Sequence, residues 1–486
     1  MYVYVYGLAL FLFLPWVVPS SSADDRPNIV VILCDDLGYG DLQCYGHPHI
    51  QTPHLNALAA TGVRLTQCYA AAPVCSPSRV GLLTGRSPNR AGVFDWIPPA
   101  KKKTANARES VHMKREEVTV ARLLKSAGYR TCMAGKWHCN SRFNDPQQQP
   151  QPDAFGFDHW FATQNNASPS HENPGNFVRN GKPVGPLKGY SCQLVVDEVV
   201  TWMTQEESSG IQDPFFVFMA FHEPHEPVAS PPELVKKYSD FARNQNEAQY
   251  FANVENVDLA VGRLIAALDR MKLRKETLVI FTSDNGPETL LRYGKSAGRS
   301  YGTPHPLKGM KLHVHEAGVR VAGIVSWPET LVAGQTVSSP ISSLDFLPTF
   351  CALAKATIPK KLALDGTDIS GFLRNGTFKR AKPLLWCYFS AISQPKVAIR
   401  DGPWKLLATL DENQLPRFTN LTASEKQQAQ SARLTQFELY DLRNDATESK
   451  NLIGSRPGKF SEMRDKLQAG YRELLDDSPV WTPAAD

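Results

Sequence analysis

Four short, continuously apolar runs constrain the fold of this chain most strongly. They cover residues 28–33, 215–220, 277–282 and 321–327. A strand with one solvated face alternates apolar and polar residues, and these runs do not alternate. We therefore predict strands that are buried on both faces, in a sheet with helices on each side.

Helical patterns lie between these runs. One of them carries apolar side chains at Val118, Ala121 and Leu124, and Gly128 follows as the expected C-terminal cap. Residues 254–271 repeat the helical spacing. Alternation of strands and helices is typical of a mostly parallel sheet. The fold class that we predict is α/β, with helices flanking that sheet.

The character of the sequence changes after about residue 375. Short strand-like pieces separated by turn residues occupy 381–450, and a final helix is expected at 459–475. This pattern predicts a smaller C-terminal α+β domain with an antiparallel sheet. A chain of 486 residues is long enough for two domains. The segments that we expect are a signal peptide at 1–23, a large domain at 24–375 and a small domain at 376–486.

The N-terminus indicates export. Residues 6–18 are almost wholly apolar, and small residues follow up to Ala23. This run is short for a membrane span, and the small residues resemble a signal-peptidase site. Because the usual positive charges are missing, an uncleaved anchor is the alternative. We expect no stable membrane insertion, and a protein that is secreted, periplasmic or, in a eukaryote, in a lysosomal-type lumen.

Charge and cysteine content exclude other classes. The net charge is +5, from 53 basic and 48 acidic residues, and the one run of three basic residues is at 101–103. A nucleic-acid surface needs denser clustering, so we expect no nucleic-acid partner. The nine cysteines fit no zinc pattern.

Acidic and amide side chains directly follow two of the predicted strands. Asp35 and Asp36 come after the first run, and Asp284 and Asn285 come after the third. In open α/β sheets, ligands bind beyond the carboxyl ends of the strands. Clustered carboxylates repel one another unless a cation joins them, and oxygen ligands suit Ca²⁺ or Mg²⁺. We predict a divalent-cation site here, with ordinary loop or capping aspartates as the alternative.

A segment at 75–86 reads Cys-Ser-Pro-Ser-Arg-Val-Gly-Leu-Leu-Thr-Gly-Arg. Ser76 and Pro77 are typical of a helix start, which places Cys75 at a helix N-terminus. Backbone N–H groups there favour anions. From the residues alone, Cys75 is either a reactive thiol of low pKa or a buried cysteine.

This segment resembles the signature of the type I sulfatases, which is C-x-P-x-R followed by L-T-G-R. Further stretches resemble the same family in the same order: Asp35-Asp36, 135–138, 224–227, 284–286, 307–311, 316–320 and 438–442. The resemblance spans nearly the whole chain after the predicted signal peptide. It implies an alkaline-phosphatase-like fold and hydrolysis of sulfate esters.

The resemblance also implies two cofactors. Cys75 would be oxidised to formylglycine by a formylglycine-generating enzyme during secretion. The cation would be Ca²⁺ rather than Mg²⁺, and residue 75 would join Asp35, Asp36, Asp284 and Asn285 as its ligands.

The catalytic roles come from the same resemblance. Arg79 and Lys136 would anchor the modified residue. His225 would protonate the leaving alcohol, and His138 would take a proton from the hydrated aldehyde. Lys136 and Lys311 would neutralise the sulfate oxygens.

The substrate beyond the sulfate is less constrained. We expect His222 and His315 to contact it. Lys136, His225 and Lys311 complete the expected substrate-binding set, and they contact the sulfate ester group. The resemblance also implies that a polar residue of the loop at 163–173 helps to hold the sulfate itself, and the candidates are Asn165, Asn166, Ser168, Ser170 and His171. A polar, histidine-rich rim favours a sulfated carbohydrate over another small sulfated molecule. A phosphoester hydrolase of the same superfamily and a non-catalytic binding protein are the alternatives.

Overall fold

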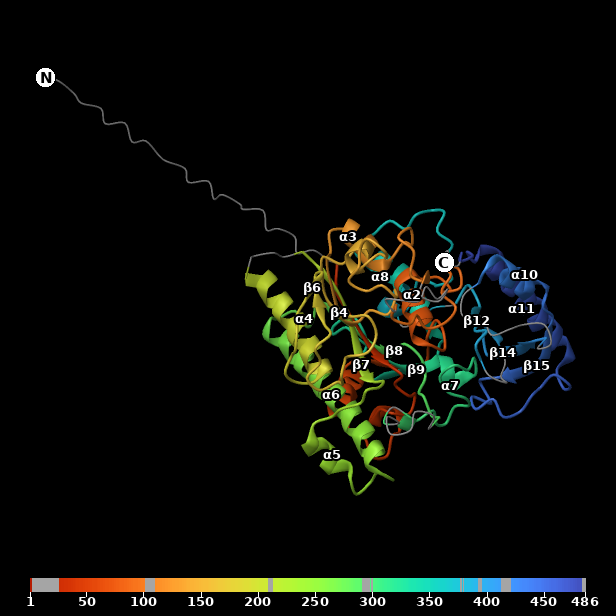
Figure 1. Cartoon of the computed structure of the whole chain (residues 1–486), viewed down its shortest axis with the longest axis horizontal. Helices are drawn as coiled ribbons and strands as arrows, with labels where there is room; N and C mark the ends of the chain where they lie inside the picture. Colours follow the sequence, from red (N-terminus) through yellow and green to blue (C-terminus); the bar gives the residue numbers. More distant parts are fainter. Residues whose placement is uncertain are drawn as a thin grey trace.

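The computed structural model describes residues 26–100, 110–208, 213–290, 300–375, 380–391, 396–411 and 421–482, with the single residues 1, 298 and 378. It contains one large sheet between two layers of helices and a small antiparallel sheet beside it (Figure 1). Apart from Met1, the predicted signal peptide lies outside the described residues, and so do the lysines at 101–103.

Within the described residues, the large sheet has eleven strands in the order β10-β2-β9-β8-β1-β7-β3-β4-β5-β6, with β11 paired to β2. Their bounds are β1 (Asn28–Asp35), β2 (Val63–Tyr69), β3 (Arg130–Lys136), β4 (His159–Thr163), β5 (Val178–Arg179), β6 (Lys182–Pro183), β7 (Phe215–Pro224), β8 (Thr277–Ser283), β9 (Arg320–Ser326), β10 (Gln335–Val337) and β11 (Ile341–Ser342). The central strands β8, β1, β7, β3 and β4 run parallel. The α/β fold class is thereby confirmed. The fourth apolar run forms β9, which is antiparallel to β8 and β2.

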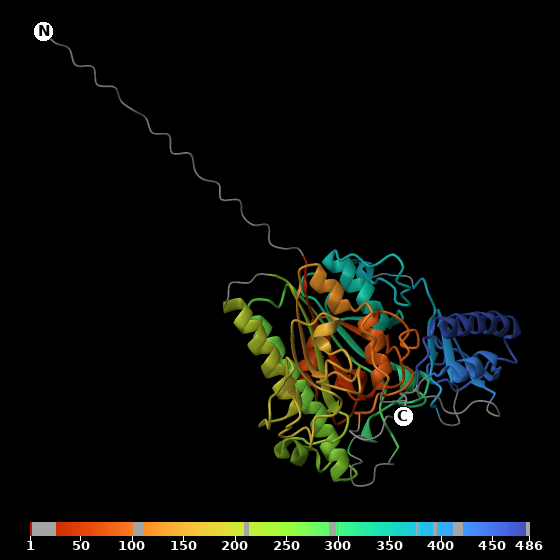
Figure 2. The ribbon, with the colours of Figure 1, turned by 45° about the horizontal axis from the view of Figure 1, so that its top comes forward.

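Helices cover both faces of this sheet (Figure 2). Their bounds are α1 (Pro53–Ala60), α2 (Cys75–Thr84), α3 (Val120–Ser126), α4 (Ser191–Ser208), α5 (Pro232–Tyr238), α6 (Gln245–Arg270), α7 (Glu316–Val319), α8 (Phe346–Ala354) and α9 (Ser370–Asn375). Short 3₁₀ turns are η1 (Gln43–Tyr45), η3 (Pro152–Phe155) and η5 (Ser343–Asp345).

The central strand β1 shows why the apolar runs do not alternate. Val31 points into the core beneath α2, α3 and α8, whereas Val30 points into the core beneath α1, α4 and α6. All residues of β1 are buried. Burial on both faces, predicted from the continuous apolar run, is therefore confirmed.

The predicted helices form, with different bounds. The first is α3, whose N-cap Thr119 accepts a hydrogen bond from the Arg122 backbone N–H. The second belongs to α6, which begins well before the predicted residue 254. Asn244 caps that earlier start by accepting a hydrogen bond from the Glu247 backbone N–H.

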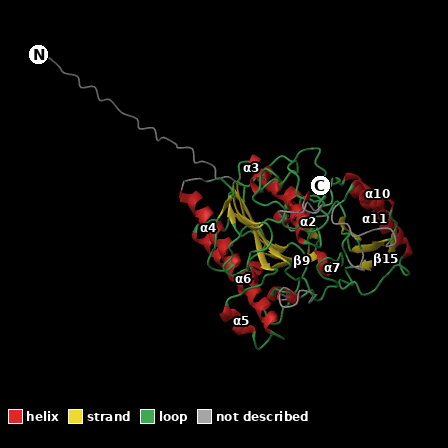
Figure 3. Ribbon diagram, in the orientation of Figure 1, coloured by secondary structure: helices red, strands yellow, loops and turns green. Residues whose placement is uncertain are grey.

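The small sheet is antiparallel and contains β12 (Leu384–Cys387), β13 (Val397–Asp401), β14 (Trp404–Leu410) and β15 (Leu434–Asp441) (Figure 3). The helices α10 (Ala423–Ser431) and α11 (Pro457–Asp477) accompany it. Leu406 of β14 and Leu467 of α11 share one apolar core. The antiparallel sheet and final helix are as predicted, and the boundary at residue 375 stays a prediction. Within the described ranges, no helix has the length and apolar composition that a membrane span requires.

Candidate active site

Four neighbouring parallel strands end at one edge of the large sheet and carry polar residues there. Asp35 ends β1 and Lys136 ends β3. Asp284 follows β8, and His225 follows β7. Because β8, β1, β7 and β3 are adjacent in the sheet, side chains far apart in sequence converge at this edge.

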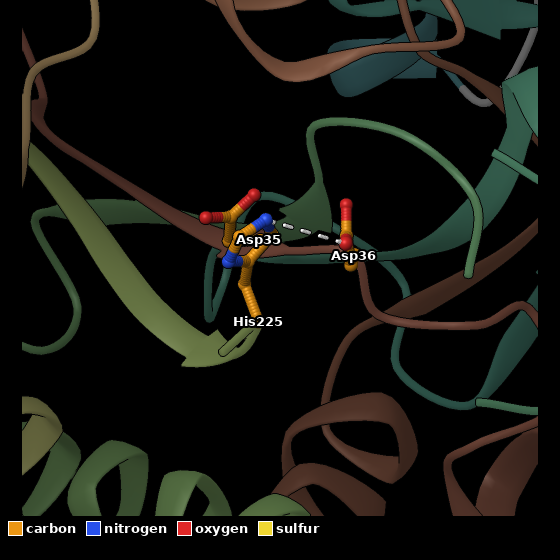
Figure 4. Close-up of side chains that lie close together, drawn as sticks. All are labelled: Asp35, Asp36 and His225. Atoms are coloured by element: carbon orange, nitrogen blue, oxygen red, sulfur yellow. Dashed lines mark ion pairs between the residues drawn. The ribbon is translucent and has the colours of Figure 1, made fainter. Parts of the chain in front are cut away.

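Asp35, Asp36 and His225 form a tight buried group (Figure 4). Each offers one ligand atom, and these atoms lie within 4.8 Å of one another. The His225 Nε2 lies 3.8 Å from Asp36 Oδ2, which is the contact drawn as a dashed line. Two carboxylates and an imidazole thus face a common point.

The backbone at Asp36 directs this convergence. Asp36 has φ of 65°, a left-handed conformation that is uncommon outside glycine and clusters at functional sites. Its backbone N–H donates to Asp284 Oδ1 at 3.3 Å. The Asn285 Nδ2 donates to Asp36 Oδ1 at 2.7 Å, which joins the ends of β1 and β8.

Three cationic side chains balance the three carboxylates. Lys136 donates a hydrogen bond to Asp35, and the Lys311 Nζ lies 2.6 Å and 2.8 Å from the two oxygens of Asp36. The Arg79 Nε donates to Asp284 Oδ2 at 2.9 Å. All these side chains are buried, so each charge depends on its neighbours for compensation.

The donor set fits a hard divalent cation. Within the described residues, Asp35 Oδ1 and Asn285 Oδ1 are buried and accept no hydrogen bond. Such oxygens are costly to bury unless a ligand satisfies them. Together with Asp36 and Asp284 they supply the oxygen ligands that Ca²⁺ and Mg²⁺ prefer.

Burial and charge shift the titration of this cluster. Burial would raise the pKa of Asp35, but Lys136 and the other nearby cationic groups hold it well below its usual range. Burial and the neighbouring Asp35 raise the pKa of Asp284 to about 7. Burial lowers the pKa of His225 to about 3, against the opposing effect of the two aspartates. Burial, with Lys136 and Arg79, holds the pKa of His138 well below its usual value.

Cys75 is the first residue of α2, as the sequence predicted. Its side chain is buried, and burial raises the pKa of the thiol. A thiol of raised pKa is a poor nucleophile, which argues against the alternative of a reactive thiolate. Arg79 lies one turn later on the same helix, where its Nη1 donates to the Lys136 carbonyl at 2.8 Å.

A pocket of about 330 Å³ lies beside Cys75, His225 and Lys311. Predicted residues that line it are Cys75, His138, His225, Lys311, Asn165 and Asn166. Further lining residues, which the sequence analysis did not single out, are Val74, Trp96, Glu226 and Leu312. Trp96 stands between the polar Asp95 and the apolar Ile97 in an irregular stretch, so no periodicity pointed to it.

Three predicted substrate contacts, Lys136, His222 and His315, are not among the residues that line this pocket, and Lys136 donates to Asp35 as described above. The His222 Nε2 is buried 2.8 Å from the Thr163 hydroxyl. His315 is also buried, with its Nε2 3.8 Å from Glu438 Oε2 of the small sheet. Their substrate contacts stay predictions, as do the roles of the residues at the pocket.

Comparisons with known proteins all find similarity to sulfatases. A family profile described as sulfatase matches residues 27–356. Human arylsulfatase A is 35% identical over 471 residues, which cover 91% of this chain and 86% of that protein. Human steryl-sulfatase is 29% identical over 452 residues, covering 79% of this chain and 75% of that protein.

A solved structure agrees with this. The structure of Ps i-CgsB in complex with k-i-k-neocarrahexaose matches with a TM-score of 0.76 and 26% identity. The match covers 94% of this chain and 95% of that one. The likeness therefore includes the small antiparallel sheet as well as the large one.

Proposed function

This chain belongs to the sulfatase family and hydrolyses sulfate esters, and from that premise we propose that it acts on sulfated carbohydrates through a formylglycine at position 75. The observation that carries the proposal is the position of Cys75. It begins α2 and lines a pocket with Lys311 and His225, above a buried cluster of carboxylates.

The modified residue would supply the nucleophile. A hydrated formylglycine offers a hydroxyl that can attack sulfur, which the buried thiol of high pKa does not. Arg79 holds the start of α2 against the sheet edge through Asp284 and the Lys136 carbonyl. These bonds fix the position of residue 75 relative to the carboxylates.

A divalent cation would be held by Asp35, Asp36, Asp284 and Asn285, with Ca²⁺ favoured over Mg²⁺. When bound, it would polarise oxygen atoms and offset negative charge. Asp35 Oδ1 and Asn285 Oδ1, which are buried and accept no hydrogen bond from the described residues, support this assignment. Lys136 and Lys311 lie beside these carboxylates, where their ammonium groups would neutralise the sulfate oxygens.

His138 is arranged to accept a proton. Its Nε2 lies 2.9 Å from the Ile97 carbonyl, which can only accept, so Nε2 carries the hydrogen. Within the described residues, Nδ1 has no partner and is a free acceptor. Because the pKa of His138 is held well below its usual value, the ring is neutral and can receive the proton of residue 75 at Nδ1.

His225 is arranged as the acid for the leaving group. Its Nδ1 lies 2.9 Å from the Glu226 carbonyl and therefore carries a hydrogen, which leaves Nε2 toward Asp36. Burial lowers the pKa of His225 to about 3. The negative charge of a bound sulfate ester would favour the protonated ring, and in this proposal Nε2 delivers that proton to the departing oxygen.

Carbohydrate is the substrate class that we favour. The amides of Asn165 and Asn166 line the pocket, and a structural relative was solved with k-i-k-neocarrahexaose. The likeness to steryl-sulfatase makes a flat apolar sulfate the second candidate. We also propose that the chain is exported, from the apolar run at 6–18 and the need for formylglycine formation during secretion.

Mass spectrometry of the tryptic peptide Leu65–Arg79 tests the proposal. We expect an aldehyde at position 75 and an unmodified thiol at Cys68 of the same peptide, which serves as the internal control. If residue 75 stays a thiol in protein from its native host, the formylglycine mechanism fails. A comparison of the rates at which the protein hydrolyses an aryl sulfate and an aryl phosphate then tests which ester is the substrate. A large preference for the phosphate would contradict sulfate specificity.

A further inference from the structure

Trp96 is an exposed aromatic side chain at the mouth of the catalytic pocket. It is 38% exposed, and it lines the pocket together with Cys75 and Lys311. Other large apolar side chains are exposed in the described residues, such as Phe241 and Val332, but they do not line this pocket. An exposed indole beside reacting groups is typical of a ligand contact.

The position of Trp96 is fixed from two sides. Asp95 Oδ1 accepts hydrogen bonds from the Trp96 backbone N–H at 2.8 Å and from the Tyr388 hydroxyl at 3.1 Å. The Ile97 backbone N–H donates to the Ser76 hydroxyl at 3.0 Å, next to residue 75. The backbone that carries the indole is therefore held in place, so only the side-chain rotamer of Trp96 has to be fixed when a ligand contacts it.

Two amides offer hydrogen-bond acceptors in the same pocket. Asn165 Oδ1 and Asn166 Oδ1 are buried, and neither accepts a hydrogen bond from the part of the chain that the structure describes. Both residues line the pocket with Trp96. A ligand with hydroxyl donors would satisfy these oxygens, whereas a purely apolar ligand would leave them unpaired.

We propose that Trp96, Asn165 and Asn166 form a subsite for the sugar ring that carries the sulfate, an inference that rests on the function proposed above. The indole packs against the C–H face of the pyranose. The two amides accept hydrogen bonds from its hydroxyl groups. A pyranose combines an apolar face with hydroxyl donors at its edge, and this combination matches the subsite better than a steroid does.

Kinetics of W96A, W96F and N165A test the subsite. The probe is the fastest substrate among O-sulfated galactose, glucosamine and N-acetylgalactosamine, and the inhibition constant of inorganic sulfate is measured alongside. Loss of the stacked surface should lower kcat/KM of W96A by about 10- to 50-fold, while W96F keeps most activity. N165A should lose about 5- to 20-fold. Sulfate inhibition should stay unchanged in all three, because inorganic sulfate has no ring.

Tyr388→Phe tests how the backbone that carries the indole is held. This variant removes the hydroxyl bond to Asp95 without touching the pocket. Because Tyr388 only positions the subsite, Tyr388→Phe should raise KM for the sugar sulfate about threefold and leave kcat and sulfate inhibition unchanged. F241A, which removes an exposed aromatic side chain elsewhere, is the matched control and should match the wild type.

The outcomes separate the subsite from the proposed function. If wild type hydrolyses aryl sulfates but no sugar sulfate, the carbohydrate assignment fails and the subsite fails with it. If wild type hydrolyses sugar sulfates but W96A does so equally well, only the subsite is wrong. Parallel loss of sulfate inhibition and sugar hydrolysis in W96A, at an unchanged Tm, would assign Trp96 to the sulfate site instead and overturn the proposal.

Discussion

The ammonium group of Lys405 lies 2.9 Å from Glu316 Oε1, and both side chains are completely buried. Lys405 belongs to β14 of the small sheet, and Glu316 begins α7 beside the active-site loop that carries Lys311. The same ammonium lies 3.0 Å from Glu448 Oε1. One buried cation therefore joins the small sheet to a segment that leads into the catalytic site.

Removal of this cation should destabilise the protein strongly. K405M removes the ammonium group that two buried carboxylates, Glu316 and Glu448, share, and it leaves Glu316 with Arg320 as its remaining cationic partner. Breaking a buried ion pair costs about 3–5 kcal/mol in the free energy of unfolding. Urea denaturation measures this loss, and K275M is the control because Lys275 and Glu329 form an exposed pair. Equal stability of K405M and wild type would show that the buried pair contributes nothing.

Low pH should lower the free energy of unfolding because Glu316 becomes protonated. Burial raises its pKa, but Lys405 and Arg320 oppose this and bring the pKa to about 2. In the unfolded chain the pKa of a glutamate is about 4.3. Between these two pKa values the unfolded chain is therefore protonated at Glu316, whereas the native protein is not. The stabilisation is therefore complete above about pH 5 and is lost as the pH falls toward 2, by roughly 3 kcal/mol.

E316Q isolates this effect. The substitution removes the titrating group, so the stability difference between wild type and E316Q should shrink as the pH is lowered from 7 to 3. Urea unfolding at several pH values measures both curves. Parallel curves would mean that another carboxylate is responsible for the acid sensitivity.

Arg79 should not be replaceable by lysine. Its guanidinium binds Asp284 and the Lys136 carbonyl at the same time, and a single ammonium cannot reproduce that fork. We expect R79K to lower kcat/KM for an aryl sulfate by at least about 100-fold. R86K is the matched control in the same signature, because Arg86 pairs with Glu117 nearer the surface. Near-normal activity of R79K would contradict the role of this fork in placing residue 75.

Removal of the cation should abolish activity and lower Tm. After dialysis against a chelator, added Ca²⁺ should restore both, and more effectively than Mg²⁺. Ca²⁺ at 100 times its dissociation constant should add about 2.7 kcal/mol to the free energy of unfolding. N285A, which deletes one unpaired oxygen, should need more Ca²⁺ for the same Tm shift. Full activity of the chelated protein would disprove a required cation.

Local sequence was enough to predict the elements and the placement of the main groups. The continuous apolar run at 28–33 specified a two-sided strand, and Asp35 and Asp36 follow from its end. The Ser-Pro pair after Cys75 specified the start of α2. These predictions succeeded because each depends on neighbours within a few residues, and because parallel strands place their carboxyl ends at one edge.

Only the tertiary structure decided which distant side chains meet. No local pattern pairs Lys311 with Asp36 or Lys405 with Glu316, since each pair forms through strand order and packing. The same applies to Trp96, which lines the pocket next to Asp95, a residue that accepts a hydrogen bond from Tyr388 of a segment far along the chain. His315 faces Glu438 rather than the pocket for this reason too. The sequence by itself determined which candidate catalytic groups the chain carries and after which strands they stand. The packing of the two sheets decided the partners that fix their geometry and charge.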